Sequence, residues 1–350
     1  MSYRPFMVAG PCSAESEQQV MDCALALKHA GIDIFRAGLW KPRTSPDTFA
    51  GVGAQGLAWL KRVQSETDIK VATEIATAEH LLLCLDNDIT HLWIGARTCA
   101  NPFMLQQIAE AIKLSGRAAE LCVMVKNPIH PDLAAWLGAI ERLQQAGAGR
   151  IMAVHRGFSD SVSSSVESRN NGMRNDPLWS IPLSLKRRMP HLPILCDPSH
   201  LSGDRHLVTR ISQQALDLGM DGLMIEVHPV PEKALSDAKQ QITPDEFKVL
   251  VDSLHLPSAQ NQEFTALQAL RNEIDRIDSS IWNLIEERLE VAKQIGDIKH
   301  KAGMPVYQNQ RYSQLLQARL SWAQNVGLEE KPVRQIIEAI HELAISKQLK

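Results

Sequence analysis

The sequence predicts an α/β protein, a (β/α)8 TIM barrel, followed by an all-helical domain. Two observations support this fold class. Over residues 1–252, eight short apolar runs alternate with helix-length segments, as expected for parallel strands joined by crossover helices. From residue 264 to 302, apolar residues recur every three or four positions without an intervening proline, which predicts one long helix. We expect the barrel at residues 1–254, a linker at 255–264 and the helical domain at 265–350.

Each expected strand is short and apolar on both faces, which is typical of a parallel sheet covered by helices. The strands are expected at residues 6–9, 32–36, 70–74, 91–94, 122–126, 151–154, 193–196 and 223–226. Eight strand–helix units in about 250 residues fit a closed barrel. The competing arrangement, a doubly wound open sheet, usually has fewer strands.

The long helix carries one apolar stripe that needs a partner. The stripe comprises Leu270, Ile274, Ile277, Ile281, Leu284, Val291, Ile295 and Ile298. Gly303 and Pro305 end the helix, and two shorter helices are expected at residues 310–325 and 330–347. Three helices of such unequal length do not form a compact bundle in one chain, so we expect a homodimer that covers the stripe.

Composition excludes several classes of protein. The 350 residues include 37 basic and 40 acidic side chains, a formal net charge of −3 that argues against broad nucleic-acid binding. No apolar run approaches the length of a membrane span, and no signal peptide is visible. The six cysteines lack paired spacing, which indicates free thiols in a reducing compartment. We therefore expect a cytoplasmic protein without a membrane or nucleic-acid partner.

The chemistry is expected at the carboxyl ends of the strands, where the loops of a barrel build the active site. One set of residues there is Cys12, His200, Glu226 and Asp237. A thiol, an imidazole and two carboxylates can together hold a divalent transition metal. Taken singly, each is better explained as a buried thiol or a salt-bridge partner, but together at one barrel mouth they favour a metal site.

A second set at the same mouth is cationic: Arg36, Lys41, Arg43, Arg97, Lys126 and Arg156. Cations at this density repel one another unless anions bind between them, and guanidinium groups match phosphate and carboxylate oxygens. The set predicts one or two substrates that carry several negative charges. A solvated basic rim explains any one of these residues, but it does not explain six that directly follow apolar strands.

These residues lie in motifs that resemble a known family. With Lys41-Pro42-Arg43-Thr44-Ser45, Gly10-Pro11-Cys12 and Ile94-Gly95-Ala96-Arg97, residues 1–250 resemble the 3-deoxy-D-arabino-heptulosonate 7-phosphate synthases. The resemblance implies condensation of phosphoenolpyruvate with erythrose 4-phosphate and release of phosphate. It also implies a divalent metal, for which manganese is the first choice and iron, cobalt and zinc are alternatives. The octulosonate 8-phosphate synthases, which use arabinose 5-phosphate, usually read Lys-Ala-Asn-Arg-Thr-Ser at the first motif.

The resemblance also implies individual roles. Cys12, His200, Glu226 and Asp237 match the metal ligands, and Arg97, Lys126 and Arg156 match the groups that bind phosphoenolpyruvate. Lys41 is expected near the carboxylate of that substrate, with Arg36 beside it, and Lys41 either protonates the developing alkoxide or only stabilises charge. Arg43 and Thr44 match the pair that receives the aldose phosphate, and Glu74 resembles a carboxylate that positions water. The sequence departs from many relatives at His155, where an acid is common.

The helical domain contains its own charged positions. Arg288 falls within the apolar stripe, between Leu284 and Val291. We therefore expect an anion to pair with its guanidinium group unless that group reaches solvent. Lys299 returns to the same face about 16 Å further along the helix. Arg271 and Arg311 add positive charge to this region.

Residues 265–349 resemble the all-helical chorismate mutases through Leu270-Arg271, Glu287-Arg288, Lys299, Arg311 and Gln348. The resemblance implies rearrangement of chorismate to prephenate, with Lys299 and Gln348 facing the ether oxygen. Arg288 and Arg271, the latter supplied by the partner chain, would hold the carboxylates. Tyr312 stands where many members have Glu, and Ala344 where some have Ser. The domain is thus either a working mutase, a module that binds chorismate or prephenate and inhibits the barrel, or both.

Overall fold

The computed structural model describes residues 4–42, 48–159, 172–256 and 263–349. The chain divides into two compact units, Met1–Ser258 and Ala259–Lys350, which are described separately below.

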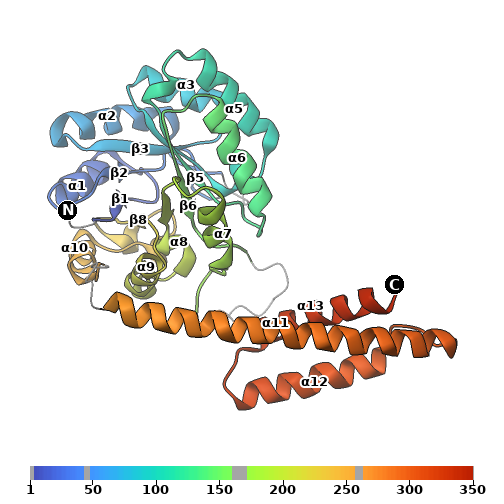
Figure 1. Ribbon diagram of the computed structural model, residues 1–350. Helices are drawn as coiled ribbons and strands as arrows, with labels where there is room; N and C mark the ends of the chain where they lie inside the picture. The colour runs from blue at the N-terminus through green and yellow to red at the C-terminus, as the bar shows by residue number, and fades with distance from the viewer. Residues whose placement is uncertain (1–3, 43–47, 160–171, 257–262, 350) are drawn as a thin grey trace. The chain divides into compact units, whose positions relative to one another are not determined.

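The first unit is a closed barrel of parallel strands, in the order β1 to β8, with β8 paired back to β1 (Figure 1). The strands are β1 (Phe6–Gly10), β2 (Ile34–Arg36), β3 (Lys70–Ile75), β4 (His91–Ile94), β5 (Cys122–Lys126), β6 (Arg150–His155), β7 (Ile194–Cys196) and β8 (Gly222–Glu226). All eight expected strands are present, and the predicted fold class is confirmed. The strand at 32–36 is shorter than expected, because it begins only at Ile34.

Helices cover the outside of the barrel. The α-helices of this unit are α1 (Glu17–Leu27), α2 (Gly56–Thr67), α3 (Ala78–Asp86), α4 (Ala96–Cys99), α5 (Pro102–Leu114), α6 (Leu133–Gln145), α7 (Ser180–Arg188), α8 (Pro198–Ser202), α9 (Val208–Asp217) and α10 (Pro244–Ser253). Short 3-10 turns lie at η1 (Gly53–Gln55), η2 (Ala118–Glu120), η3 (Arg205–Leu207), η4 (Pro231–Lys233) and η5 (Ala238–Gln240). Several helices begin after a residue whose side chain caps the first turn. At α10, Thr243 and Glu246 form a complete capping box.

The alternation of side chains along the strands positions the site. Inward-facing residues such as Ile34, Trp93 and Met124 pack together inside the barrel, while their neighbours in sequence pack against the helices. At six of the eight strands, the next inward position toward the carboxyl end is polar; at β1 and β4 it is Gly10 and Gly95. The six polar residues are Arg36, Glu74, Lys126, Arg156, Asp197 and Glu226. The strand period therefore brings these side chains to one mouth of the barrel.

Close packing at this mouth depends on glycine. Gly10, at the end of β1, has a φ of +147°, and a Cβ added there would lie 2.2 Å from the carbonyl oxygen of Arg36. Any side chain at this position would separate β1 from β2 just below the site.

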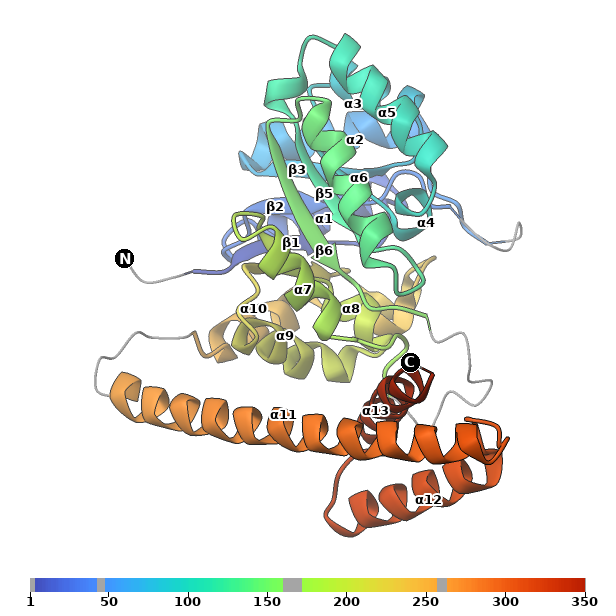
Figure 2. The ribbon, with the colours of Figure 1, turned by 45° about the vertical axis from the view of Figure 1, so that its right-hand side comes forward.

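The second unit contains α11 (Glu263–Lys301), α12 (Asn309–Asn325) and α13 (Glu330–Gln348), close to the predicted limits. The carboxyl half of α11 packs on α13, and α12 packs on α13 as well (Figure 2). Gly296 allows the closest approach, because a Cβ there would lie 2.8 Å from the Cα of Gln348. The amino half of α11 extends past both shorter helices, and its stripe residues Leu270 and Ile274 remain 65% and 57% exposed.

None of the helices in the described parts of the chain is long and apolar enough to cross a membrane. All six cysteines lie among the described residues, and each is buried with a free thiol.

Candidate active sites

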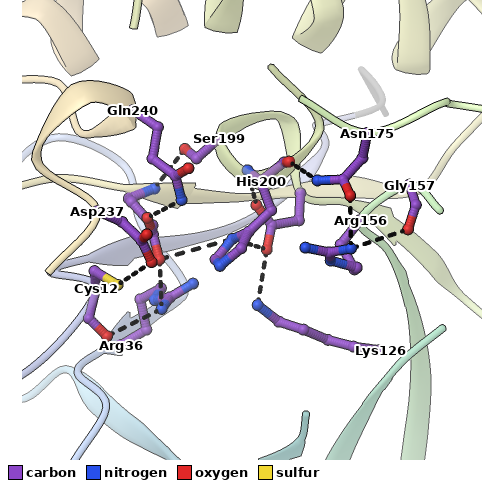
Figure 3. Close-up of polar contacts among 12 residues, drawn as sticks. Cys12, Arg36, Lys126, Arg156, Gly157, Asn175, Ser199, His200, Asp237 and Gln240 are labelled. Carbon is purple, nitrogen blue, oxygen red and sulfur yellow. Dashed lines mark hydrogen bonds and ion pairs between the residues drawn. The ribbon is translucent and has the colours of Figure 1, made fainter. Parts of the chain in front are cut away.

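Three predicted metal ligands meet at the barrel mouth. Cys12, Glu226 and Asp237 each offer a ligand atom, and these atoms lie within 4.8 Å of one another. Cys12 comes from the loop after β1, Glu226 ends β8, and Asp237 lies just before η5 (Figure 3). The Cys12 thiol lies 3.3 Å from Oδ2 of Asp237. The fourth predicted ligand, His200, stands beside this group, with its Nδ1 3.7 Å from Oε1 of Glu226.

A short helix positions His200. Asp197 is the N-cap of α8, and its Oδ1 accepts a hydrogen bond from the backbone N–H of His200 at 3.0 Å. The other oxygen of Asp197 lies 2.9 Å from Nδ1 of the His200 ring. Burial lowers the pKa of His200, so the ring is neutral at pH 7, the form in which imidazole binds metals.

Lys41 lies among the same groups. Its ammonium contacts the Cys12 sulfur and lies 2.7 Å from Oδ2 of Asp237. Burial alone would lower the pKa of Lys41, but the combined effect of Cys12, Glu226 and Asp237 raises it, so Lys41 remains protonated. Burial alone would raise the pKa of Asp237, but Lys41 holds it well below its usual range. Burial and the Glu226 charge raise the pKa of the Cys12 thiol to about 12.

The donor set fits a divalent transition metal. A thiol, two carboxylates and a neighbouring neutral imidazole combine soft and hard ligands, a mixture that accepts several such ions. The raised pKa of Cys12 means that its thiol must lose a proton to become a ligand.

The cations form a layer next to the ligand group. Arg36 is 2% exposed and its Nη2 lies 3.1 Å from Oε1 of Glu226. Within the described residues, its Nε and Nη1 are buried without a hydrogen-bond partner. Lys126 pairs with Asp197 at 2.8 Å. The buried ring of Trp93 lies beneath both cations, 4.7 Å from the Arg36 guanidinium carbon and 5.9 Å from the Lys126 nitrogen.

Arg156 completes this layer. Its Nη1 donates to Oδ1 of Asn175 at 3.1 Å, and its backbone N–H donates to Oδ1 of Asn127 at 2.7 Å. Burial, together with the like charges of Arg174 and Arg97, lowers the pKa of Arg156 to about 10. The Arg36 donors, which find no partner among the described residues, and the crowded charge around Arg156 indicate a site that binds an anion.

Two of the remaining predicted residues of the barrel, Glu74 and Arg97, lie among the described residues. Glu74 accepts a hydrogen bond from the Trp93 indole at 3.0 Å, and Gly95 leaves room for its carboxylate. Arg97 lies in α4 and is exposed. Arg43 and Thr44 lie outside the described residues. His155 faces away from the mouth into a cluster of Trp136, Phe158 and Trp179, so the departure at this position does not alter the site.

Several site residues were missing from the predicted set. Asp197 pairs with both Lys126 and His200, while Arg174, Asn175 and Gln240 contact predicted ligands or cations. Asp197 had a usable signal, because it continues the inward row after Leu195 of β7. Arg174 and Asn175 lie in a loop and Gln240 ends the short turn η5, so none of the three follows a strand or helix period that the sequence could reveal.

In the helical unit, part of the predicted set comes together. The Lys299 ammonium donates to the backbone carbonyl of Val306 at 2.6 Å and to Oε1 of Gln348 at 3.2 Å. Arg288 is half-buried, and its Nη1 is buried without a hydrogen-bond partner among the described residues. Arg271 and Arg311 are exposed.

The two departures in this unit are both near the packed helices. Tyr312 packs against His341 with ring centroids 4.5 Å apart. Ala344 is buried. Tyr312 thus supplies a phenol and no carboxylate at its position, and Ala344 supplies no hydroxyl.

Comparisons with known proteins match both units. Residues 2–256 match the model of the DAHP synthetase I family, and residues 270–349 match that of chorismate mutase type II. The chain is 33% identical to phospho-2-dehydro-3-deoxyheptonate aldolase from Thermotoga maritima, over 71% of this chain and 68% of that protein. It is 28% identical to 2-dehydro-3-deoxyphosphooctonate aldolase from Desulfotalea psychrophila, over 71% of this chain and 88% of that protein.

Solved structures agree with these matches. The crystal structure of the Thermotoga maritima DAHP synthase aligns with a TM-score of 0.60 at 31% identity, covering 71% of this chain and 67% of that one. Both resemblances noted in the sequence are confirmed. The chain belongs to the DAHP synthetase I family, and its carboxyl-terminal residues form a domain of the type II chorismate mutase family.

Proposed function

We propose that the barrel condenses phosphoenolpyruvate with erythrose 4-phosphate, giving 3-deoxy-D-arabino-heptulosonate 7-phosphate and phosphate. The observation that carries this proposal is the layer of buried cations beside Cys12, Glu226 and Asp237. The cations suit a small substrate with phosphate and carboxylate groups, and the ligand group suits a metal that activates an aldehyde.

The anionic substrate would bind across the cations. Arg156, Lys126 and Arg97 would hold phosphoenolpyruvate, and Arg36 with Lys41 would lie near its carboxylate. Nε and Nη1 of Arg36 support this assignment, because they lack a hydrogen-bond partner in the described part of the chain and an anion would supply one. Arg43 and Thr44 would receive the phosphate of the aldose.

Cys12, His200, Glu226 and Asp237 would hold a divalent metal, with manganese as the first choice and iron, cobalt or zinc as alternatives. Such an ion, when bound, supplies a Lewis acid that polarises the aldehyde. The Lys41 ammonium already contacts two of these residues, which indicates that the pocket favours positive charge.

The reaction then proceeds through groups of this chain. The enol carbon of phosphoenolpyruvate attacks the aldehyde carbon, and Lys41 either donates a proton to the developing alkoxide or stabilises its charge. Glu74 holds a water that adds to the cationic carbon left behind, and phosphate leaves by cleavage of its C–O bond. The raised pKa of Lys41 keeps its ammonium charged beside Asp237, which favours charge stabilisation, since a proton donor works best with a pKa near the operating pH.

Arabinose 5-phosphate is the rival aldose, since the octulosonate relatives share the fold and 28% identity. The motif Lys41-Pro42-Arg43-Thr44-Ser45 and the higher identity to the heptulosonate enzyme favour erythrose 4-phosphate.

The helical unit would rearrange chorismate to prephenate. Lys299 and Gln348, whose side chains already contact each other, would face the ether oxygen, and Arg288 would hold a carboxylate. The exposed apolar stripe of α11 supports a homodimer, because a second copy would cover it and bring Arg271 to the partner's site. Binding of a downstream ligand here would also inhibit the barrel.

Replacing Cys12 with Ala should abolish metal-dependent turnover, because it removes one of the ligands. We expect manganese-supported consumption of phosphoenolpyruvate to fall by more than about 100-fold, beyond the usual loss for an outer-shell partner. Cys99→Ala is the matched control, since both thiols are 2% exposed and Cys99 lies outside the ligand group. Near-normal turnover by Cys12→Ala would remove Cys12 from the metal site.

Two variants separate catalysis from ligand sensing in the helical unit. Lys299→Ala should slow chorismate rearrangement by about 100-fold or more, as for loss of one oxyanion donor, and should keep inhibition of the barrel by prephenate. Arg288→Ala should lose both, because it removes a carboxylate contact. Lys293→Ala, an exposed position on the same helix, is the control. A wild-type chain without mutase activity whose barrel is still inhibited by prephenate would indicate a binding module only.

Ile281→Asp should convert the dimer to a monomer, because it places an unpaired charge in the apolar stripe. Sedimentation velocity at micromolar concentration measures this change. Val249→Asp, on the exposed surface of α10, should leave the dimer intact. A monomeric wild-type protein would contradict the proposed dimer.

A further inference from the structure

Arg174 reaches the metal-ligand group from a loop between β6 and α7. Its backbone N–H donates to the carbonyl of Ser202 at 2.8 Å, and that of Asn175 donates to the carbonyl of Leu201 at 3.1 Å. The Asn175 side chain adds a hydrogen bond of 2.6 Å to the carbonyl of His200. This segment is therefore fixed on α8, the helix that carries His200 (Figure 3).

One guanidinium nitrogen of Arg174 serves two acceptors. Its Nη1 lies 3.3 Å from Oδ1 of Asp237 and 3.0 Å from Oε1 of Gln240. The amide nitrogen of Gln240, which is 1% exposed, donates to Oε2 of Glu226 at 2.7 Å. Arg174 thus contacts one carboxylate directly and another through a buried amide.

These contacts use only one oxygen of each carboxylate. Oδ1 of Asp237 and Oε2 of Glu226 face Arg174 and Gln240. The other oxygens, Oδ2 of Asp237 and Oε1 of Glu226, face Lys41 and Arg36, and Oδ2 also lies 3.3 Å from the Cys12 sulfur. The hydrogen bonds therefore set the rotation of both carboxylates.

Two glycines leave space for this segment. Gly203 has a φ of +68°, and a Cβ added there would lie 2.6 Å from Cβ of Arg174. Gly157 has a φ of +80°, and a Cβ there would lie 2.8 Å from Cβ of Asn175. Side chains at these positions would displace the segment that carries both residues.

We propose that Arg174 is a positioning residue that orients the carboxylates of Asp237 and Glu226 toward a bound metal, directly and through Gln240. Outer-shell partners of this kind hold ligands in the binding geometry before the metal arrives, and their loss lowers metal affinity. This inference rests on the metal site of the proposed function. It is separate from substrate binding, which the other cations of the mouth would perform.

The test measures manganese affinity of the metal-stripped full chain by isothermal titration calorimetry. Arg174→Gln should weaken manganese binding by about 10–100-fold, the usual effect of removing an outer-shell partner. Arg174→Lys, which keeps the charge and one donor group, should recover part of that loss. Gln240→Leu should also weaken binding, because it removes the link to Glu226. Phosphoenolpyruvate affinity of the metal-free protein should fall by less than the manganese affinity does, because Arg174 contacts Asp237 and Gln240 and would act on the anion only through its charge.

Arg62→Gln is the matched control. Arg62 is 49% exposed, like Arg174 at 50%, and it also pairs with carboxylates, but it lies on α2, and its partners are Glu66 of the same helix and Glu17 of α1. If Arg174→Gln binds manganese as tightly as Arg62→Gln, the inference is wrong. It is also wrong if Arg174→Gln loses phosphoenolpyruvate affinity and keeps manganese affinity, which would assign Arg174 to the substrate.

Metal binding by the wild-type chain shows whether the proposed metal site itself is wrong. A wild-type chain that binds no manganese, iron, cobalt or zinc would overturn that site and this inference together. If Arg174→Gln does not fold, as judged by circular dichroism, Arg174→Lys and Gln240→Leu decide the inference by the same comparison with Arg62→Gln.

Discussion

Two buried ion pairs, Arg36–Glu226 and Lys126–Asp197, hold the barrel mouth on which the proposed chemistry depends. Removing charges from water costs several kcal/mol per ion, and packed apolar residues often stabilise a fold at least as well as a buried pair. Stability alone therefore does not explain why these four buried residues are charged. They stand at the last inward positions of their strands or directly after them. Arg36 of β2 therefore meets Glu226 of β8 only when β8 pairs with β1 and closes the barrel, and Lys126 meets Asp197 across β6.

The pairs also link the two halves of the site. Glu226 contacts Arg36 on the substrate side and belongs to the ligand group with Cys12 and Asp237. Asp197 contacts Lys126 on one side and His200 on the other. Each carboxylate thus joins a cation that would bind an anionic substrate to a residue that would bind a metal. A change in either set alters the electrostatics of the other, because the low dielectric strengthens both.

The sequence alone predicted the fold and most of the inward-facing charged side chains at the barrel mouth. Strand alternation predicts that Arg36, Lys126 and Glu226 point inward, and the same rule would have found Asp197. Arg174 and Gln240 could not be predicted, because loop conformation depends on tertiary contacts such as that of Arg174 with Ser202. The apolar stripe predicted the limits of α11 closely. It did not predict that the stripe would stay exposed along the whole helix within one chain: Val291 and Ile298 are 55% and 66% exposed, because α13 packs on a neighbouring face that includes Gly296.

The central claim is that the mouth joins phosphoenolpyruvate to a four-carbon aldose phosphate in a metal-dependent reaction. The most direct measurement is phosphoenolpyruvate consumption by the metal-stripped full chain, with erythrose 4-phosphate or arabinose 5-phosphate, before and after addition of manganese. The account predicts no consumption without metal, and consumption restored by manganese with erythrose 4-phosphate only. Restoration with arabinose 5-phosphate alone, or equal rates with and without metal, would contradict it.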